Sequence, residues 1–111
     1  MISDEFLSFL GITKKSGNLF LGMDVVKENI RKKGIMLVLT TKDISDSSFE
    51  KISFICKKNK VKILKINYTM EDIKASFGKY SGIIGVSNEN FAKKIVSITV
   101  EHKEELYGKK I

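Results

Sequence analysis

The sequence contains no proline and no tryptophan, and it has a single cysteine and a single histidine. Because one cysteine has no partner in the chain, an internal disulfide is excluded, and Cys56, at the end of a short apolar run, is expected to be a buried, reduced thiol. No apolar run is long enough to cross a bilayer, and the acidic N-terminal stretch does not fit a secretory signal. We therefore expect a cytoplasmic protein that does not act in a membrane.

Side chains that carry catalysis or bind metal ions are also scarce. His102 lies far from Cys56 in the sequence, and no cluster of cysteine and histidine has the spacing of metal ligands. Adjacent acids such as Glu71 and Asp72 point in different directions on a helix. The glycines match neither a Walker loop nor a dinucleotide fingerprint. We expect no catalytic residue, no metal ion and no cofactor, and hence a protein that is not an enzyme.

Positive charge is what the sequence has in excess. Twenty lysine and arginine residues against 13 acidic residues give a net charge of +7, with an isoelectric point near 9.5. At this size the excess favours a polyanionic partner, RNA or DNA. An anionic membrane is the competitor, but no predicted helix pairs a basic face with an apolar aromatic-rich face. A basic composition that merely serves solubility also stays open.

Apolar periodicity divides the chain into alternating helices and strands. Helices are expected over residues 3–15, with Ser3 as the N-cap, and over 23–33, 47–59, 69–77 and 89–106; strands are expected over 19–21, 35–41, 61–66 and 83–86. No repeat and no low-complexity segment interrupts this order. It predicts one domain over residues 1–111, a three-layer α/β/α sandwich around a mixed sheet of about four strands.

The rest of the chain is organised around residues 13–34. A basic turn precedes a short apolar strand, and Gly22 then allows the backbone to turn into a helix. N–H groups exposed at that helix start, with Lys14 and Lys15 upstream, suit a phosphate-bearing partner. From these residues alone an ordinary strand–helix junction is the favoured interpretation. The predicted sandwich would allow this junction to meet the loop Lys79–Gly82 at one end of the sheet.

A second basic stretch follows the third predicted helix. A solvated helix end and an edge strand are the favoured explanation, and an auxiliary RNA contact is the weaker one. Its lysines are Lys57, Lys58, Lys60, Lys62 and Lys65.

Three segments together resemble the ribosomal L7Ae/L30e family, and more narrowly its bacterial branch of small ribosome-associated proteins. They read LGITKKSGNLFLGMDVV, IRKKGIMLVLTTKDIS and IKASFGKYSGIIGVSNENFAKKI. The specific features are a basic pair, a glycine, a hydrophobic run, a second glycine and a helix, and later a glycine, a basic loop and an apolar strand. The resemblance covers about Leu10 to Ile95, and it implies the same α/β/α sandwich.

Members of this family typically bind kink-turn or related bent RNA. The resemblance thus implies a structured RNA as partner, ribosomal RNA first, with ribosomal or RNA-processing proteins as further partners. It places RNA contacts at the turn into the second helix and in the loop before the last strand, and the excess charge adds lysines and an arginine nearby. The RNA-binding residues expected on these grounds are Lys14, Lys15, Gly22, Met23, Asp24, Val25, Lys27, Glu28, Arg31, Lys79, Tyr80, Ser81 and Gly82.

The helix start departs from the pattern of the well-characterised kink-turn binders, which carry Asn-Glu followed three residues later by Lys. An ungapped match places Asp24, Val25 and Glu28 at these positions. Asp24 can accept a hydrogen bond from a guanine edge but lacks the amide donor, and the Val25 side chain can do neither. Glu28 would repel a phosphate unless a one-residue shift lets Lys27 serve. RNA binding remains the main expectation, and the alternative is a protein-interaction module of the same fold that lacks kink-turn specificity.

Overall fold

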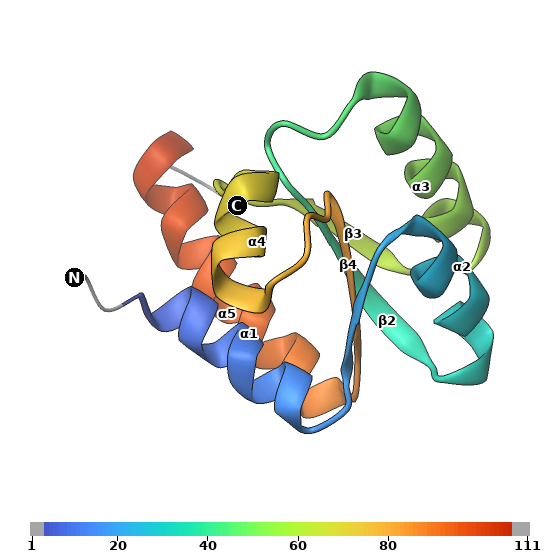
Figure 1. The fold of residues 1–111 in the computed structure, drawn as a ribbon, viewed down its shortest axis with the longest axis horizontal. Helices are drawn as coiled ribbons and strands as arrows, with labels where there is room; N and C mark the ends of the chain where they lie inside the picture. The colour runs from blue at the N-terminus through green and yellow to red at the C-terminus, as the bar shows by residue number, and fades with distance from the viewer. Residues whose placement is uncertain (1–3, 108–111) are drawn as a thin grey trace.

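The computed structural model describes residues 4–107, with side chains described as far as Thr99. Within these residues five helices and four strands alternate along the chain, as the periodicity predicts (Figure 1). Their bounds are α1 (Glu5–Lys15), β1 (Leu19–Leu21), α2 (Met23–Lys32), β2 (Ile35–Thr40), α3 (Asp46–Lys58), β3 (Lys62–Lys65), α4 (Met70–Phe77), β4 (Ile83–Ser87) and α5 (Glu89–Tyr107).

The four strands form one mixed sheet in the order β1-β4-β2-β3. β4 runs antiparallel to both β1 and β2, whereas β2 and β3 are parallel. Every residue of the central strand β4 is buried, and β2 is buried except at Met36. β3 lies at the edge, where Lys62 and Lys65 are exposed, so the prediction of an edge strand for this basic segment is confirmed.

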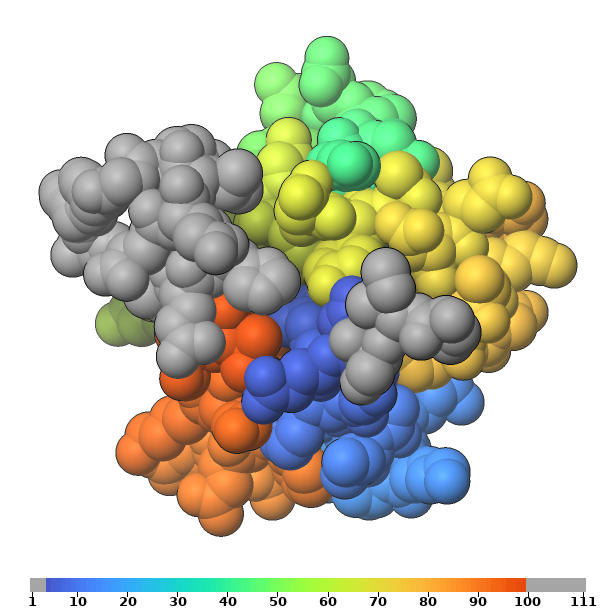
Figure 2. Space-filling model, turned by 90° about the vertical axis from the view of Figure 1, so that its left-hand side faces the viewer, coloured from blue at the N-terminus to red at the C-terminus, as the bar shows by residue number. Residues whose placement is uncertain are grey.

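Helices cover both faces of the sheet (Figure 1). α1, α4 and α5 lie on one face, over a core that includes Leu10, Ile73 and Ile95. α2 and α3 lie on the other face, over a smaller core that includes Val26 and Ile52. Figure 2 shows the first face, in which α1 (blue) lies between α5 (orange) and the yellow residues of α4. The layered α/β/α architecture predicted from the sequence is confirmed.

Short polar side chains close most of the helix starts. The Asp4 carboxylate accepts a hydrogen bond from the Leu7 N–H (3.0 Å) and caps α1; the predicted cap Ser3 lies outside the described residues, and this cap comes one residue later. Thr69 and Asp72 form a capping box at the start of α4, as their spacing of three residues favours. Caps of this kind satisfy N–H groups that have no partner within the helix.

The approach of α2 to the sheet depends on Gly85 in β4. A Cβ atom placed there would lie 2.9 Å from Ile35 Cδ1 and 3.1 Å from Val26 Cγ2, distances at which the neighbours would have to move. Glycine at this position therefore lets the buried side of α2 pack closely on the sheet.

Cys56 is buried on the inner face of α3, as predicted. Burial raises the pKa of its thiol to about 11, so the reactive thiolate is disfavoured at neutral pH. Phe54, two residues earlier on the same helix, points away from this core and is 68% exposed. This side chain therefore lies off the apolar face of its helix.

Candidate functional site

The turn between β1 and α2 is made at Gly22. Its backbone has φ 108° and ψ 152°, a conformation that is essentially restricted to glycine. The Gly22 N–H donates a hydrogen bond to the Ile83 carbonyl oxygen (2.9 Å), which joins the end of β1 to the start of β4. Within the described residues no side chain caps α2, so its first-turn N–H groups are left for another acceptor.

The loop between α4 and β4 returns to this turn. The Lys79 ammonium donates a hydrogen bond to the Leu21 carbonyl oxygen (3.4 Å), and it lies 3.7 Å from the position that a Cβ atom would take at Gly22. The two segments therefore meet at one end of the sheet, as the sandwich architecture would allow. A cation thus stands beside an open helix start, where both attract an anion.

Hydrogen bonds inside the loop hold its shape. The Ser81 hydroxyl donates to the Ile83 carbonyl oxygen (2.7 Å) and accepts from the Ile83 N–H (3.3 Å). The Gly82 carbonyl oxygen accepts from the Thr41 N–H (3.0 Å). Ser81 is only 5% exposed, so among the predicted site residues it faces inward and shapes the loop. Tyr80, by contrast, is 58% exposed, with the Lys74 ammonium 5.4 Å from its ring centre.

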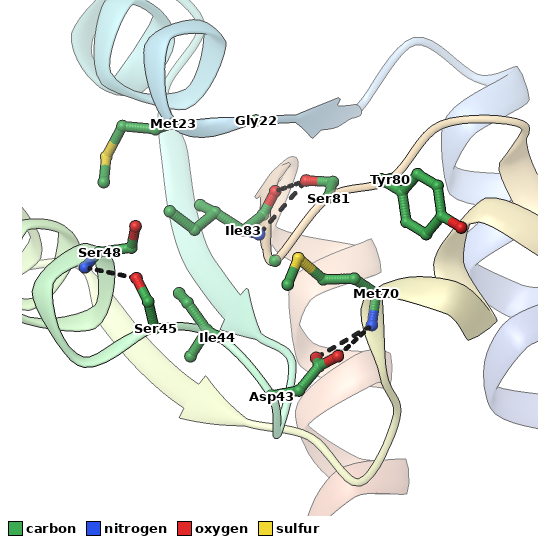
Figure 3. Close-up of a pocket in the computed structure, with 11 residues that line it drawn as sticks. Gly22, Met23, Asp43, Ile44, Ser45, Ser48, Met70, Tyr80, Ser81 and Ile83 are labelled. Carbon is green, nitrogen blue, oxygen red and sulfur yellow. Dashed lines mark hydrogen bonds between the residues drawn. The ribbon is translucent and has the colours of Figure 1, made fainter.

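A hollow of about 350 Å³ opens between the turn, the loop and the starts of α3 and α4 (Figure 3). Met23 and Met70 project into it, and Asp43 joins two of its walls by accepting a hydrogen bond from the Met70 N–H (3.0 Å). Apolar walls with a polar rim suit a flat, partly polar ligand. The lining residues are Gly22, Met23, Asp43, Ile44, Ser45, Ser48, Met70, Tyr80, Ser81, Gly82 and Ile83.

The basic pair Lys14 and Lys15 lies farther from Gly22 than the sequence suggests. β1 is antiparallel to β4, and its start at Asn18 lies beside Ser87, at the opposite end of β4 from Gly22. Four extended residues separate the two points by about 13 Å. The predicted junction is therefore divided, with its basic turn and its helix start at opposite ends of β1.

The two lysines nevertheless face the same side of the molecule as α4. A Cβ atom at Gly11 would touch the Phe77 ring, at 4.0 Å, and Lys14 and Lys15 follow Gly11 by three and four residues on α1, so they share its face. In Figure 2 the light-blue end of α1 and the yellow residues around the end of α4 lie on the same side. The pair can therefore contact a partner that extends past the loop.

The remaining predicted residues lie on exposed parts of α2. Asp24 and Lys27 are exposed, and Glu28 pairs with Lys32 across one helical turn at 3.4 Å. Arg31 donates a hydrogen bond to the Asn59 side chain (3.5 Å). The three ion pairs among the side chains of residues 4–99 engage Lys32, Lys93 and Lys94, so the cations of the predicted site are not neutralised by acidic side chains there.

A comparison with known proteins shows the family to which the chain belongs. The family model described as "Ribosomal protein L7Ae/L30e/S12e/Gadd45 family" matches residues 4–96, which include both segments of the site. The chain belongs to this family. The resemblance that the three sequence segments indicate is therefore confirmed.

Among the similar proteins are one named relative and one solved structure. RNA-binding protein YlxQ of Bacillus subtilis (strain 168) is 28% identical over 95 residues, which are 85% of this chain and 94% of the relative. A solved structure of a protein with unknown function from Bacillus halodurans C superposes with a TM-score of 0.78 at 18% identity, over 88% of this chain and 99% of the other. The second likeness shows the fold.

Among the residues that the structure describes, no group of three or more histidine, cysteine, aspartate or glutamate side chains is placed to hold a metal ion. No helix of the described part of the chain is long and apolar enough to span a membrane.

The sequence does not predict the part that Asp43, Ile44 and Met70 play in the site. The β2–α3 loop and α4 contribute these three residues to the walls of the hollow. The one available signal is that they follow the ends of buried strands, where loops converge.

Proposed function

We propose that this protein is a non-enzymatic, cytoplasmic RNA-binding protein that recognises structured, kink-turn-like RNA and associates with the ribosome through ribosomal RNA. Membership of the L7Ae/L30e/S12e/Gadd45 family and the name of the Bacillus subtilis relative support RNA as the partner. The observation that carries the proposal is the meeting of an uncapped helix start at Gly22 with the Lys79 ammonium.

This junction is the main contact for the phosphate backbone. The N–H groups of the first turn of α2 point toward an anion at the helix start, and Lys79 adds a full positive charge beside them. Lys27 on the same helix, and Lys14 and Lys15 below α4, extend the positive surface to neighbouring phosphates. Such contacts release counterions, so affinity falls steeply as salt is raised.

Bases are read at the hollow and at the first turn of α2. In a bent RNA some bases leave the stack and become available to apolar or aromatic side chains. Met23 and Met70 offer apolar contact to such a base inside the hollow. Asp24, exposed in the first turn of α2, accepts hydrogen bonds from the N–H groups of a guanine edge. Kink-turn preference thus depends on Asp24 and the hollow, in place of the Asn-Glu pair of other binders.

Fluorescence anisotropy tests this proposal. The probes are a kink-turn stem-loop and a regular hairpin of the same length, titrated over a range of salt concentrations. We expect the kink-turn RNA to bind more tightly, and Lys79→Gln to weaken it about tenfold and to lower the salt slope by about one. Lys93→Gln on α5, a matched exposed lysine, should leave the affinity unchanged. Affinity that ignores salt, or equal affinity in both variants, would contradict the proposal.

A protein-interaction module is the second candidate, and Val25 favours it. This apolar side chain is exposed in the first turn of α2, where the RNA-binding pattern has a glutamate. A pull-down with and without nuclease separates the two functions. A partner protein that stays bound after nuclease treatment, and is lost in Val25→Ser, would assign this surface to a protein.

A further inference from the structure

A groove runs between α2 and α3 on the outer face of the molecule, where the two helices lie side by side (Figure 1). It has a volume of about 550 Å³, and its lining residues are Met23, Lys27, Ser47, Glu50, Lys51, Phe54 and Ile55. Met23 also lines the hollow beside Gly22. The groove therefore begins where the proposed RNA site ends.

Phe54 is an exposed aromatic ring on one wall of this groove. At 68% it is the most exposed of the large hydrophobic side chains described, because the core of this layer is already filled from α3 by Ile52 and Cys56. No ring or lysine among the described residues stacks on it. Most of the Phe54 side chain is therefore open to a flat ligand.

Cations stand on both walls. Lys51 and Lys58 lie three residues before and four residues after Phe54, on the same face of α3. On α2, Lys27 lines the groove. Arg31 follows Lys27 by one helical turn and donates a hydrogen bond to the side chain of Asn59, at the C-terminal end of α3.

Carboxylates lie on the same two helices. Glu50 lines the groove, Asp46 precedes it by one turn on α3 and Asp24 precedes Lys27 on α2, while Glu28 is already paired with Lys32. Among the lining residues themselves, the two lysines Lys27 and Lys51 stand against the single carboxylate of Glu50.

Single-stranded nucleic acid has the matching chemistry. Its bases stack on aromatic rings with little regard to sequence, and its phosphates follow a positively charged groove. A duplex would keep its bases stacked on one another and leave Phe54 without a partner. We propose that the α2–α3 groove binds an unpaired strand that leaves the structured RNA, with a base on Phe54 and phosphates at Lys27, Arg31, Lys51 and Lys58. This inference rests on the proposed function, because Met23 connects the two sites.

The test compares the kink-turn stem-loop with the same RNA carrying a short oligouridine tail on its 5′ or its 3′ end. For the unaltered protein we expect one of the tailed RNAs to bind about fivefold more tightly, or more, than the untailed RNA. Phe54→Ala should abolish this gain and leave the affinity for the untailed RNA unchanged. Ile12→Ala removes an equally accessible apolar side chain, 55% exposed on α1, and should keep the gain.

A second variant tests the charges. Lys51→Gln combined with Lys58→Gln should lower the salt slope for the tailed RNA by about 1.4 and leave that for the untailed RNA unchanged. The matched double variant Lys93→Gln and Lys94→Gln should change neither.

Each outcome has one meaning. If the untailed RNA binds but neither tail adds affinity, or if Phe54→Ala keeps the gain, the groove is not an RNA site and the proposed function stands. If no RNA binds, the proposed function fails, and this inference fails with it. If Phe54→Ala alters only the binding of a protein, the groove is a protein-docking surface and the inference is overturned.

Discussion

The start of α2 differs from the starts of the other four helices. Asp4, Ser45, Thr69 and Asn88 each accept a hydrogen bond from N–H groups in the first turn of α1, α3, α4 and α5. Among the described residues, only α2 begins without such a side chain, at Gly22. Four helix starts are thus closed by side chains of the fold itself, whereas the first-turn N–H groups of α2 have no side-chain acceptor among the described residues.

The distribution of charge follows the same division. On the face formed by α1 and α5, Lys93 and Lys94 pair with Glu89 and Glu5. Beside the open start of α2, Lys79 contacts a backbone carbonyl and no carboxylate among the described side chains. At the start of α2, a cation without a carboxylate partner therefore stands beside N–H groups that no side chain caps.

Replacing Gly22 should have the largest effect on stability. Gly22→Ala forces an L-residue into a conformation with φ 108°, and we expect it to lower the free energy of unfolding by about 2 to 3 kcal/mol in a urea titration. Gly11→Ala is the control, because its new methyl would make ordinary contact in a helix, and it should be neutral or stabilising. Equal effects in the two variants would show that Gly22 is not special.

Opening the start of α1 should cost less. Asp4→Ala removes the cap of α1 and the acceptor of the Tyr68 hydroxyl (2.6 Å), so we expect a loss of about 2 kcal/mol in unfolding free energy. RNA affinity should not change, since α1 starts far from Gly22. Asp4→Asn keeps the cap geometry and should recover most of the stability. A fall in RNA affinity with Asp4→Ala would break the distinction between the two helix starts.

Alkaline pH should destabilise the protein through Tyr68, whose hydroxyl donates to the same Asp4 carboxylate. Burial first, and then the hydrogen bond to Asp4, raise the pKa of Tyr68. A pKa higher in the folded than in the unfolded state gives a stabilisation that is complete below about pH 10 and is lost as the pH rises above it. Urea titrations at several pH values should show this decline, and Tyr68→Phe should lose about 1 kcal/mol at neutral pH and decline less. Parallel curves for the two proteins would contradict this account.

The smallest effect is expected at Glu28. Glu28→Gln removes a negative charge from α2 near the phosphates, so RNA affinity should rise about twofold at low salt. The unfolding free energy should change by less than about 0.5 kcal/mol, because the lost pair with Lys32 is exposed. Glu71→Gln on α4 is the matched control for the removal of an exposed acid and should raise the affinity less. Weaker binding by Glu28→Gln would indicate that Glu28 itself contacts the RNA.

Local patterns in the sequence predict the elements well, because each depends on neighbours along the chain. The capping box at Thr69 and Asp72, the edge position of β3 and the outward Phe54 all follow from spacing. The long-range geometry of the fold does not follow from spacing. Nothing in the sequence says that β1 pairs antiparallel with β4, which places Asn18 beside Ser87 and Gly22 beside Ile83.

The same limit applies to the hollow and the loop. Met70 and Asp43 become its walls only because β2 lies between β4 and β3 in the sheet, an order that periodicity cannot give. Ser81 looks like a surface residue in a polar loop, yet its hydroxyl turns inward to the Ile83 backbone. Single-residue roles in this site depend on packing partners that are distant in the sequence.

Amide NMR spectra recorded during titration with the kink-turn stem-loop test the central claim most directly. The account predicts the largest shifts at the N–H groups of Met23, Asp24 and Val25 and along residues 79–82, with the capped N–H groups of Leu7 and Phe91 unchanged. Shifts that gather at those capped starts and spare α2, or a spectrum that RNA leaves unaltered, would contradict it.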